Sequence, residues 1–115
     1  MYCGHCCNEP CSCFEVDPVP VSRTKAIDMI LNERIRQNSL HGETYSSILQ
    51  AVCAIGEEHG ELSEAIYETL FDQKRPELSG EDNIIKEACQ LAAVCVKLIE
   101  GILDGNINLQ REDSH

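Results

Sequence analysis

The residues best suited to chemistry in this chain are glutamates crowded into one short stretch. Five glutamates fall within the twelve residues from 57 to 68: Glu57, Glu58, Glu61, Glu64 and Glu68. If the stretch is helical, at about 100° per residue, Glu58 and Glu61 stand together beside an apolar stripe centred on Leu62. The other three turn toward water. We therefore expect Glu58 and Glu61 to form a pair of carboxylates at the edge of the core.

A second acidic position lies on a later helical stretch, where Glu87 and Gln90 flank an apolar stripe centred on Cys95. Two helices packed together could bring Glu58, Glu61 and Glu87 to one point. Three converging carboxylates repel one another unless a cation lies between them. Oxygen-only ligands suit Mg²⁺ or Mn²⁺. The alternative is a solvated acidic face, although so many glutamates with few lysine partners one turn away are costly without a cation.

The segments Glu57–Ile66 and Lys86–Val96 resemble the MazG-like branch of the all-α nucleoside triphosphate pyrophosphohydrolases. That family is marked by Glu-Glu-x-x-Glu on one helix and Glu-x-x-Asp on a later one. The 25 residues between Glu61 and Glu87 fit the gap that the family allows. The resemblance covers about residues 25–104 and leaves out the start of the chain.

The resemblance implies a helical dimer or tetramer that uses Mg²⁺ to split a nucleoside triphosphate into its monophosphate and pyrophosphate. By position, Glu58, Glu61 and Glu87 would be metal ligands, with Glu61 also catalytic. Glu57 would be a catalytic residue, acting as a further ligand or as a base beyond the ligands. Gln90 stands where the family has aspartate. Its amide oxygen can ligate Mg²⁺, but it brings no charge and cannot act as a base. The alternative function is therefore a non-catalytic nucleotide- or protein-binding module.

Cysteines are concentrated at the start of the chain, where five of the eight lie: Cys3, Cys6, Cys7, Cys11 and Cys13. The Cys3-x-x-Cys6 spacing is that of half a zinc site, which Cys11 and Cys13 would complete as a tight knuckle with a structural or docking role. A bare tail and a redox pair are the alternatives. The remaining three, Cys53, Cys89 and Cys95, have apolar neighbours and are expected to be reduced and packed in the core.

Prolines divide the chain. Pro18 and Pro20 indicate an extended linker, so we expect a Cys-rich segment over residues 1–21 and a helical domain over 22–115. Within the domain, apolar periodicity predicts helices over about 22–40, 45–71 and 81–103, with Ser22 as the first N-cap. The first helix should bury Ala26, Ile27, Ile30, Leu31 and Ile35.

Composition narrows the possible partners. The net charge of −11 argues against direct binding of nucleic acid or anionic membrane, and no apolar run approaches a membrane span. With no secretory signal pattern, we expect a cytoplasmic protein. The basic side chains Arg34, Arg36, Lys86 and Lys97 could reach phosphates and His41 a base, although such residues are usually solvated or ion-paired.

The third helix is apolar nearly all round from Ala88 to Ile99, and two other short helices cannot easily cover it. The expected fold is therefore an all-α antiparallel helical bundle of MazG-like type. We expect a homodimer or homotetramer to complete it and the Cys-rich segment to be appended to it.

Overall fold

The computed structural model describes residues 18–72, 76–107 and 109, and these residues form helices and no strand. In chain order the elements are α1 (Val21–His41), α2 (Ile48–Tyr67), the π-helical turn η2 (Glu68–Asp72), the 3-10 turn η3 (Pro76–Leu78) and α3 (Glu81–Leu103). The predicted all-α class is confirmed. The candidate zinc ligands Cys3, Cys6, Cys11 and Cys13 lie outside the described residues.

Local sequence signals set the helix ends. The Ser47 hydroxyl accepts a hydrogen bond from the Gln50 N–H at 3.1 Å and caps α2. Gly80, with φ of 103°, supplies the left-handed backbone that precedes α3. The predicted Ser22 cap is wrong, because α1 begins at Val21 and Pro20 is its N-cap. The extended backbone of Pro20 places its carbonyl oxygen where it accepts the first N–H groups of the helix.

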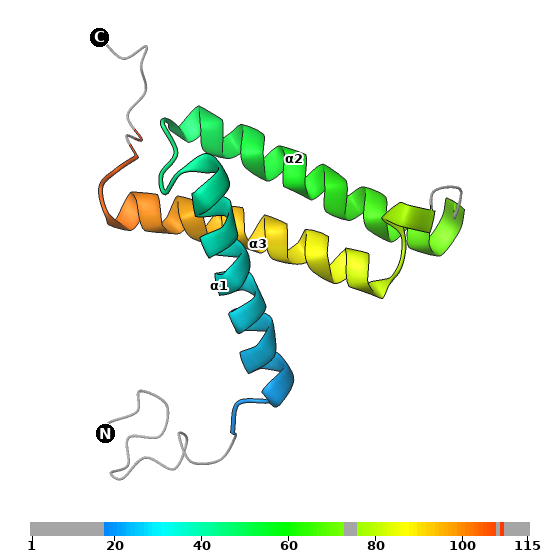
Figure 1. Ribbon diagram of the computed structural model, residues 1–115. Helices are drawn as coiled ribbons and strands as arrows, with labels where there is room; N and C mark the ends of the chain where they lie inside the picture. The colour runs from blue at the N-terminus through cyan, green and yellow to red at the C-terminus, as the bar shows by residue number, and fades with distance from the viewer. Residues whose placement is uncertain (1–17, 73–75, 108, 110–115) are drawn as a thin grey trace, which may run out of the picture.

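The helices α2 and α3 run antiparallel side by side, and α1 crosses the end of this pair at its own C-terminal half (Figure 1). The buried apolar cluster lies between α2, α3 and the loop before α2. It consists of Tyr45, Ala51, Val94 and Ile107, with Ile48, Ala54, Ile55, Leu91 and Leu98 packed against it. No residue of α1 belongs to this cluster, so the core that this chain builds by itself is small.

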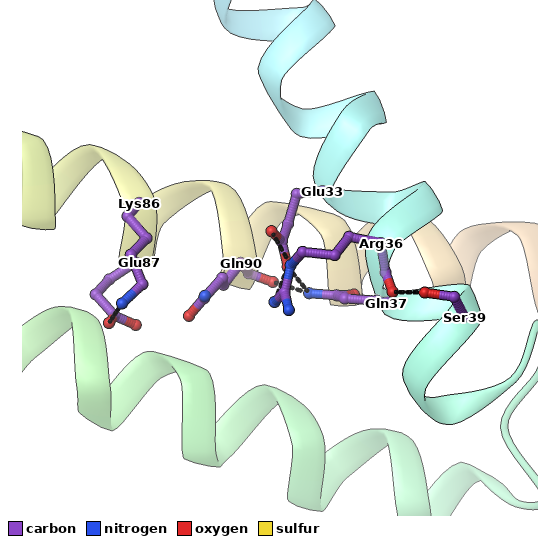
Figure 2. Close-up of polar contacts among 7 residues, drawn as sticks. All are labelled: Glu33, Arg36, Gln37, Ser39, Lys86, Glu87 and Gln90. Atoms are coloured by element: carbon purple, nitrogen blue, oxygen red, sulfur yellow. Dashed lines mark hydrogen bonds and ion pairs between the residues drawn. The ribbon is translucent and has the colours of Figure 1, made fainter.

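Polar side chains attach α1 to α3. Arg34 is 7% exposed, forms an ion pair with Glu100 at 2.8 Å and donates to the Glu43 carbonyl oxygen at 2.9 Å. Gln37, also buried, donates from Nε2 to the Gln90 carbonyl oxygen at 3.3 Å (Figure 2). These contacts hold the C-terminal half of α1 across the α2–α3 pair.

The apolar side of α1 is not buried in this chain, contrary to the prediction from its periodicity. Residues 21–29 are all exposed, and the exposed fraction reaches 67% at Ile35. The N-terminal half of α1 extends away from α2 and α3 (Figure 1). We call the side chains Ile27, Leu31 and Ile35 the α1 apolar face. Completion of the bundle by a second copy stays a prediction. Among the described residues, no helix is both long and apolar enough to cross a membrane.

Candidate metal centre

Three carboxylates from two helices meet between α2 and α3. Glu58 and Glu61, one turn apart on α2, each offer an oxygen that lies within 4.8 Å of the others and of an oxygen of Glu87 on α3. The antiparallel packing of the two helices brings Glu87 opposite that turn. The structure therefore brings together the three side chains that the sequence predicted as the charged metal ligands.

Two of these carboxylates have buried oxygens that nothing in the described part of the chain satisfies. Glu58 Oε2 and Glu87 Oε2 are buried and have no hydrogen-bond partner there. Burial raises the pKa of Glu58 to about 7, and the charges of Glu61, Glu87 and Glu57 add to the effect. Burial and then Glu61 also raise the pKa of Glu87. Unmet carboxylate oxygens next to like charges are the condition that a divalent cation relieves.

The ion pair that a described lysine forms with this cluster is peripheral. Lys86 Nζ lies 3.8 Å from a Glu87 oxygen, and the Lys86 side chain is largely exposed (Figure 2). An exposed ion pair at this distance contributes little. Lys86 therefore leaves most of the repulsion among Glu58, Glu61 and Glu87 in place.

Gln90 lies one turn after Glu87, and its side chain leaves α3 on the side that faces α2, as that of Glu87 does (Figure 2). It is half-buried, and its backbone carbonyl oxygen is already used by Gln37. Glu57 is exposed and stands apart from the three converging carboxylates. Of the five predicted site residues, three thus form the cluster and two flank it.

The buried side of α2 differs from the prediction. Its centre follows Ala51, Glu58 and Ala65, which are spaced at seven residues, and not Leu62. Seven residues advance about 700°, or 20° short of two turns, so these three side chains share one face. Glu58 therefore sits near the middle of the packed face, about 40° from where the Leu62-centred stripe placed it.

Two predictions on α2 and its continuation are wrong. Cys53, expected in the core because of its apolar neighbours, is an exposed free thiol. Glu68, expected in water, is 2% exposed at the start of η2. The small side chains of Ala51 and Ala65 allow close approach to α3, which large side chains such as Leu62 do not.

A cavity of about 320 Å³ adjoins the carboxylates. Its wall includes Glu57 and Glu58 from α2, Arg36 and Gln37 from α1, Tyr45 from the preceding loop and Lys97 from α3. The volume is at the lower end of the range for small-molecule sites. All three helices contribute to it, so the crossing of α1 over the α2–α3 pair creates the space.

The basic residues differ in how free they are to meet a ligand. Arg34 is occupied by Glu100, and Arg36 pairs with Glu33 at 2.6 Å, which lowers the pKa of Glu33 (Figure 2). Lys97 is 5% exposed, and its Nζ lies 4.3 Å from the centroid of the Tyr45 ring. The signal for Lys97 in the sequence was a lone lysine inside the apolar run Ala88–Ile99. That Lys97 lines a cavity could not be predicted from the sequence, because the cavity forms only where the three helices meet.

Comparison with known proteins adds no relative, since no model of a protein family, no curated protein and no solved structure matches this chain.

Proposed function

We propose that this protein is a Mg²⁺-dependent nucleoside triphosphate pyrophosphohydrolase of MazG-like type, which hydrolyses a nucleotide to its monophosphate and pyrophosphate. One observation carries the proposal. Glu58, Glu61 and Glu87 converge, the Oε2 atoms of Glu58 and Glu87 are buried without a partner among the described residues, and Glu58 also lines a cavity of about 320 Å³. The alternative is a solvated acidic face. Solvated glutamates would point into water and would not be expected to converge or to bury their oxygens.

Each residue has a role in this proposal. Glu58, Glu61 and Glu87 would hold Mg²⁺ or Mn²⁺, and the Gln90 amide oxygen would add a neutral ligand. The ion would neutralise charge on the phosphates and lower the pKa of a bound water. Glu57, exposed at the cavity wall, is the group suited to take a proton from the attacking water.

The cavity suits an anionic substrate despite the acidity of the protein. Arg36 brings a guanidinium to the same wall as Glu57 and Glu58. The nitrogens Nε and Nη2 of Arg36 are used by Glu33, which orients its remaining donors. Phosphates would thus meet Arg36 on one side and the metal-bound carboxylates on the other, an arrangement that positions and stabilises the transferred group.

Release of pyrophosphate from a panel of canonical and modified nucleotides, with Mg²⁺ or Mn²⁺, tests the proposal. We expect turnover in the native chain and a loss of at least about 100-fold in kcat/KM with Glu61→Gln, because the substitution removes a charged ligand but keeps the shape. Glu64→Gln, the same change at an exposed position of α2, is the matched control and should retain turnover. Equal turnover in both variants would contradict the proposal.

The alternative is a MazG-like module that binds a nucleotide or a protein without hydrolysing it, and it is favoured by the glutamine at position 90. Gln90→Asp separates the two functions, because it supplies the missing charge with little change in shape. A native chain that binds Mg²⁺ and nucleotide without turnover, together with turnover in Gln90→Asp, would establish the non-catalytic module.

A further inference from the structure

The wall of the cavity also includes Lys97 and Tyr45, besides Glu57 and Glu58. Lys97 follows Glu87 by ten residues on the same helix, which is about 15 Å along the axis. Glu57 and Glu58 are the acidic members of the cavity wall among the described residues. The cavity wall therefore offers a hydrogen-bond donor at Lys97 and carboxylates at Glu57 and Glu58.

The ammonium group of Lys97 has no counterion in the described part of the chain. The residue as a whole is 5% exposed, and its ammonium nitrogen lies 4.3 Å from the centroid of the Tyr45 ring. Burial, and then the charge of Arg34, lowers the pKa of Lys97. Burying an ammonium group without hydrogen-bond acceptors is costly, and an apolar side chain would fill the same space at lower cost. The position therefore favours a ligand with an acceptor, since none of the described residues accepts a hydrogen bond from Lys97.

Tyr45 fixes the geometry around Lys97. Its hydroxyl donates to the Val94 carbonyl oxygen at 3.3 Å, and its side chain is buried. The hydroxyl is thus committed as a donor, and the ring is held in place against Lys97 Nζ. Lys97 lines the cavity with its ammonium nitrogen over this ring, where a planar ligand with an acceptor oxygen could meet it.

We propose that Lys97 donates a hydrogen bond to a carbonyl oxygen of the substrate's nucleobase, so that the site selects keto-bearing bases over adenine. This inference rests on the proposed function, because a triphosphate held at Glu58, Glu61 and Glu87 leaves the sugar and base to occupy the rest of the cavity. Adenine carries an amino group, itself a donor, at the ring carbon where hypoxanthine carries the oxygen, so that position cannot accept a hydrogen bond from Lys97. Sites built around a buried donor reject analogues that lack its partner.

The test is calorimetric titration of the full chain, with Mg²⁺, using the uncleavable α,β-methylene analogues of ITP and ATP. The two bases differ in having an oxygen or an amino group at the same ring carbon. We expect the hypoxanthine analogue to bind about ten- to hundredfold more tightly, as befits a buried hydrogen bond from a charged donor. In Lys97→Met, which keeps the apolar stem, the ratio should fall to about one because the hypoxanthine analogue loses affinity.

Two further variants make the result decisive. Lys25→Met, the same change at an exposed position of α1, should keep the native ratio. Lys97→Gln, whose amide both donates and accepts, should bind both analogues with similar affinity and shows the effect even if Lys97→Met folds poorly. Equal affinities in the native chain, or an equal loss for both analogues in Lys97→Met, would overturn the inference.

This titration is separate from the pyrophosphate assay. A keto preference that depends on Lys97 without any turnover would reject the enzyme and keep the role of Lys97. Turnover without such a preference would reject the role of Lys97 and keep the enzyme.

Discussion

Glu58 occupies a position that helix packing would ordinarily give to an alanine. It lies on α2 between Ala51 and Ala65 on the buried face, and its Oε2 has no partner in the described structure. A carboxyl group in that setting stays protonated to a higher pH than in the unfolded chain. The pKa of about 7 follows from burial first and from the neighbouring glutamates second.

This raised pKa predicts an unusual dependence of stability on pH. Between the ordinary value of 4.5 and about 7, the folded state keeps a proton on Glu58 that the unfolded state has released. The free energy of unfolding of the metal-free protein should therefore fall as the pH rises through this window. Urea titrations at a series of pH values in the presence of a chelator measure it.

Glu58→Gln should flatten the fall in stability with pH, and Mg²⁺ should oppose it in the native chain because the ion replaces the proton. Glu64→Gln, at an exposed site on the same helix, should leave the pH dependence as it is. If the metal-free protein instead became more stable from pH 5 to pH 7, the buried carboxyl would not control this transition.

At the scale of the helices, α1 is attached by hydrogen bonds and an ion pair where the sequence predicted apolar contact. Arg34 bridges Glu100 on α3, Asn38 on its own helix and the carbonyl oxygen of Glu43 in the following loop. One guanidinium thus satisfies three separate parts of the chain. The same helix supplies Arg36 and Gln37 to the cavity wall, so this attachment also shapes the site.

Arg34→Leu should therefore weaken both the fold and the site. It leaves the Glu43 carbonyl without its donor and removes the bridge to Glu100, which we expect to lower the free energy of unfolding by about 2–3 kcal/mol. Nucleotide affinity should fall too, because α1 no longer closes the cavity. Chemical denaturation and calorimetry measure the two effects. Arg23→Leu, on the exposed half of α1, is the control and should change neither.

The helix spans were predictable because prolines and glycines mark their ends. The predicted third helix, from 81 to 103, has the bounds of α3, and Gly80 begins it as expected of a punctuating glycine. The convergence of Glu58, Glu61 and Glu87 was predictable because α2 and α3 are long enough for spacing alone to define faces.

The side of each helix that packs against its neighbours was less predictable, because the apolar periodicity of the sequence is dominated by large side chains. The stripe was centred on Leu62, whereas the tightest packing on α2 uses Ala51 and Ala65. The attachment of α1 through Arg34 and Gln37 could not be found from apolar spacing at all. The position of Lys97 in the cavity wall could not be predicted, because all three helices form this cavity and no local sequence pattern indicates it.

At the scale of the whole molecule, the α1 apolar face is an apolar surface that the described part of the chain leaves exposed. Ile27 and Leu31 are each 49% exposed on a helix whose N-terminal half lies away from α2 and α3. The sequence predicts a second copy of the chain as a partner of the third helix, and such a copy could cover this face as well. Exposed aliphatic side chains in one row are typical of surfaces that become buried on association.

We expect sedimentation to show a dimer or tetramer of the native chain. The double variant Ile27→Glu with Leu31→Glu should shift it to the monomer, since charges replace the apolar contact, while circular dichroism shows the helix content retained. Thr24→Glu places a charge on an exposed polar position of the same helix and should leave the assembly intact. A native chain that sediments as a monomer at micromolar concentration would contradict the expectation.

The geometry of α1 also has a consequence for genetics. The helix is 21 residues and about 30 Å long. Ile27 and Leu31 of the α1 apolar face lie toward its N-terminal end, and Arg36 and Gln37 of the cavity wall lie toward its C-terminal end. A contact that holds the N-terminal part of α1 would therefore also fix the part of the cavity wall that α1 forms. A selection for loss of function should therefore recover two separate groups of alleles, one around Glu58 and Lys97 and one around Ile27 and Leu31. Alleles of the first group should still assemble, whereas alleles of the second group should lose assembly and retain the residues of the cavity wall.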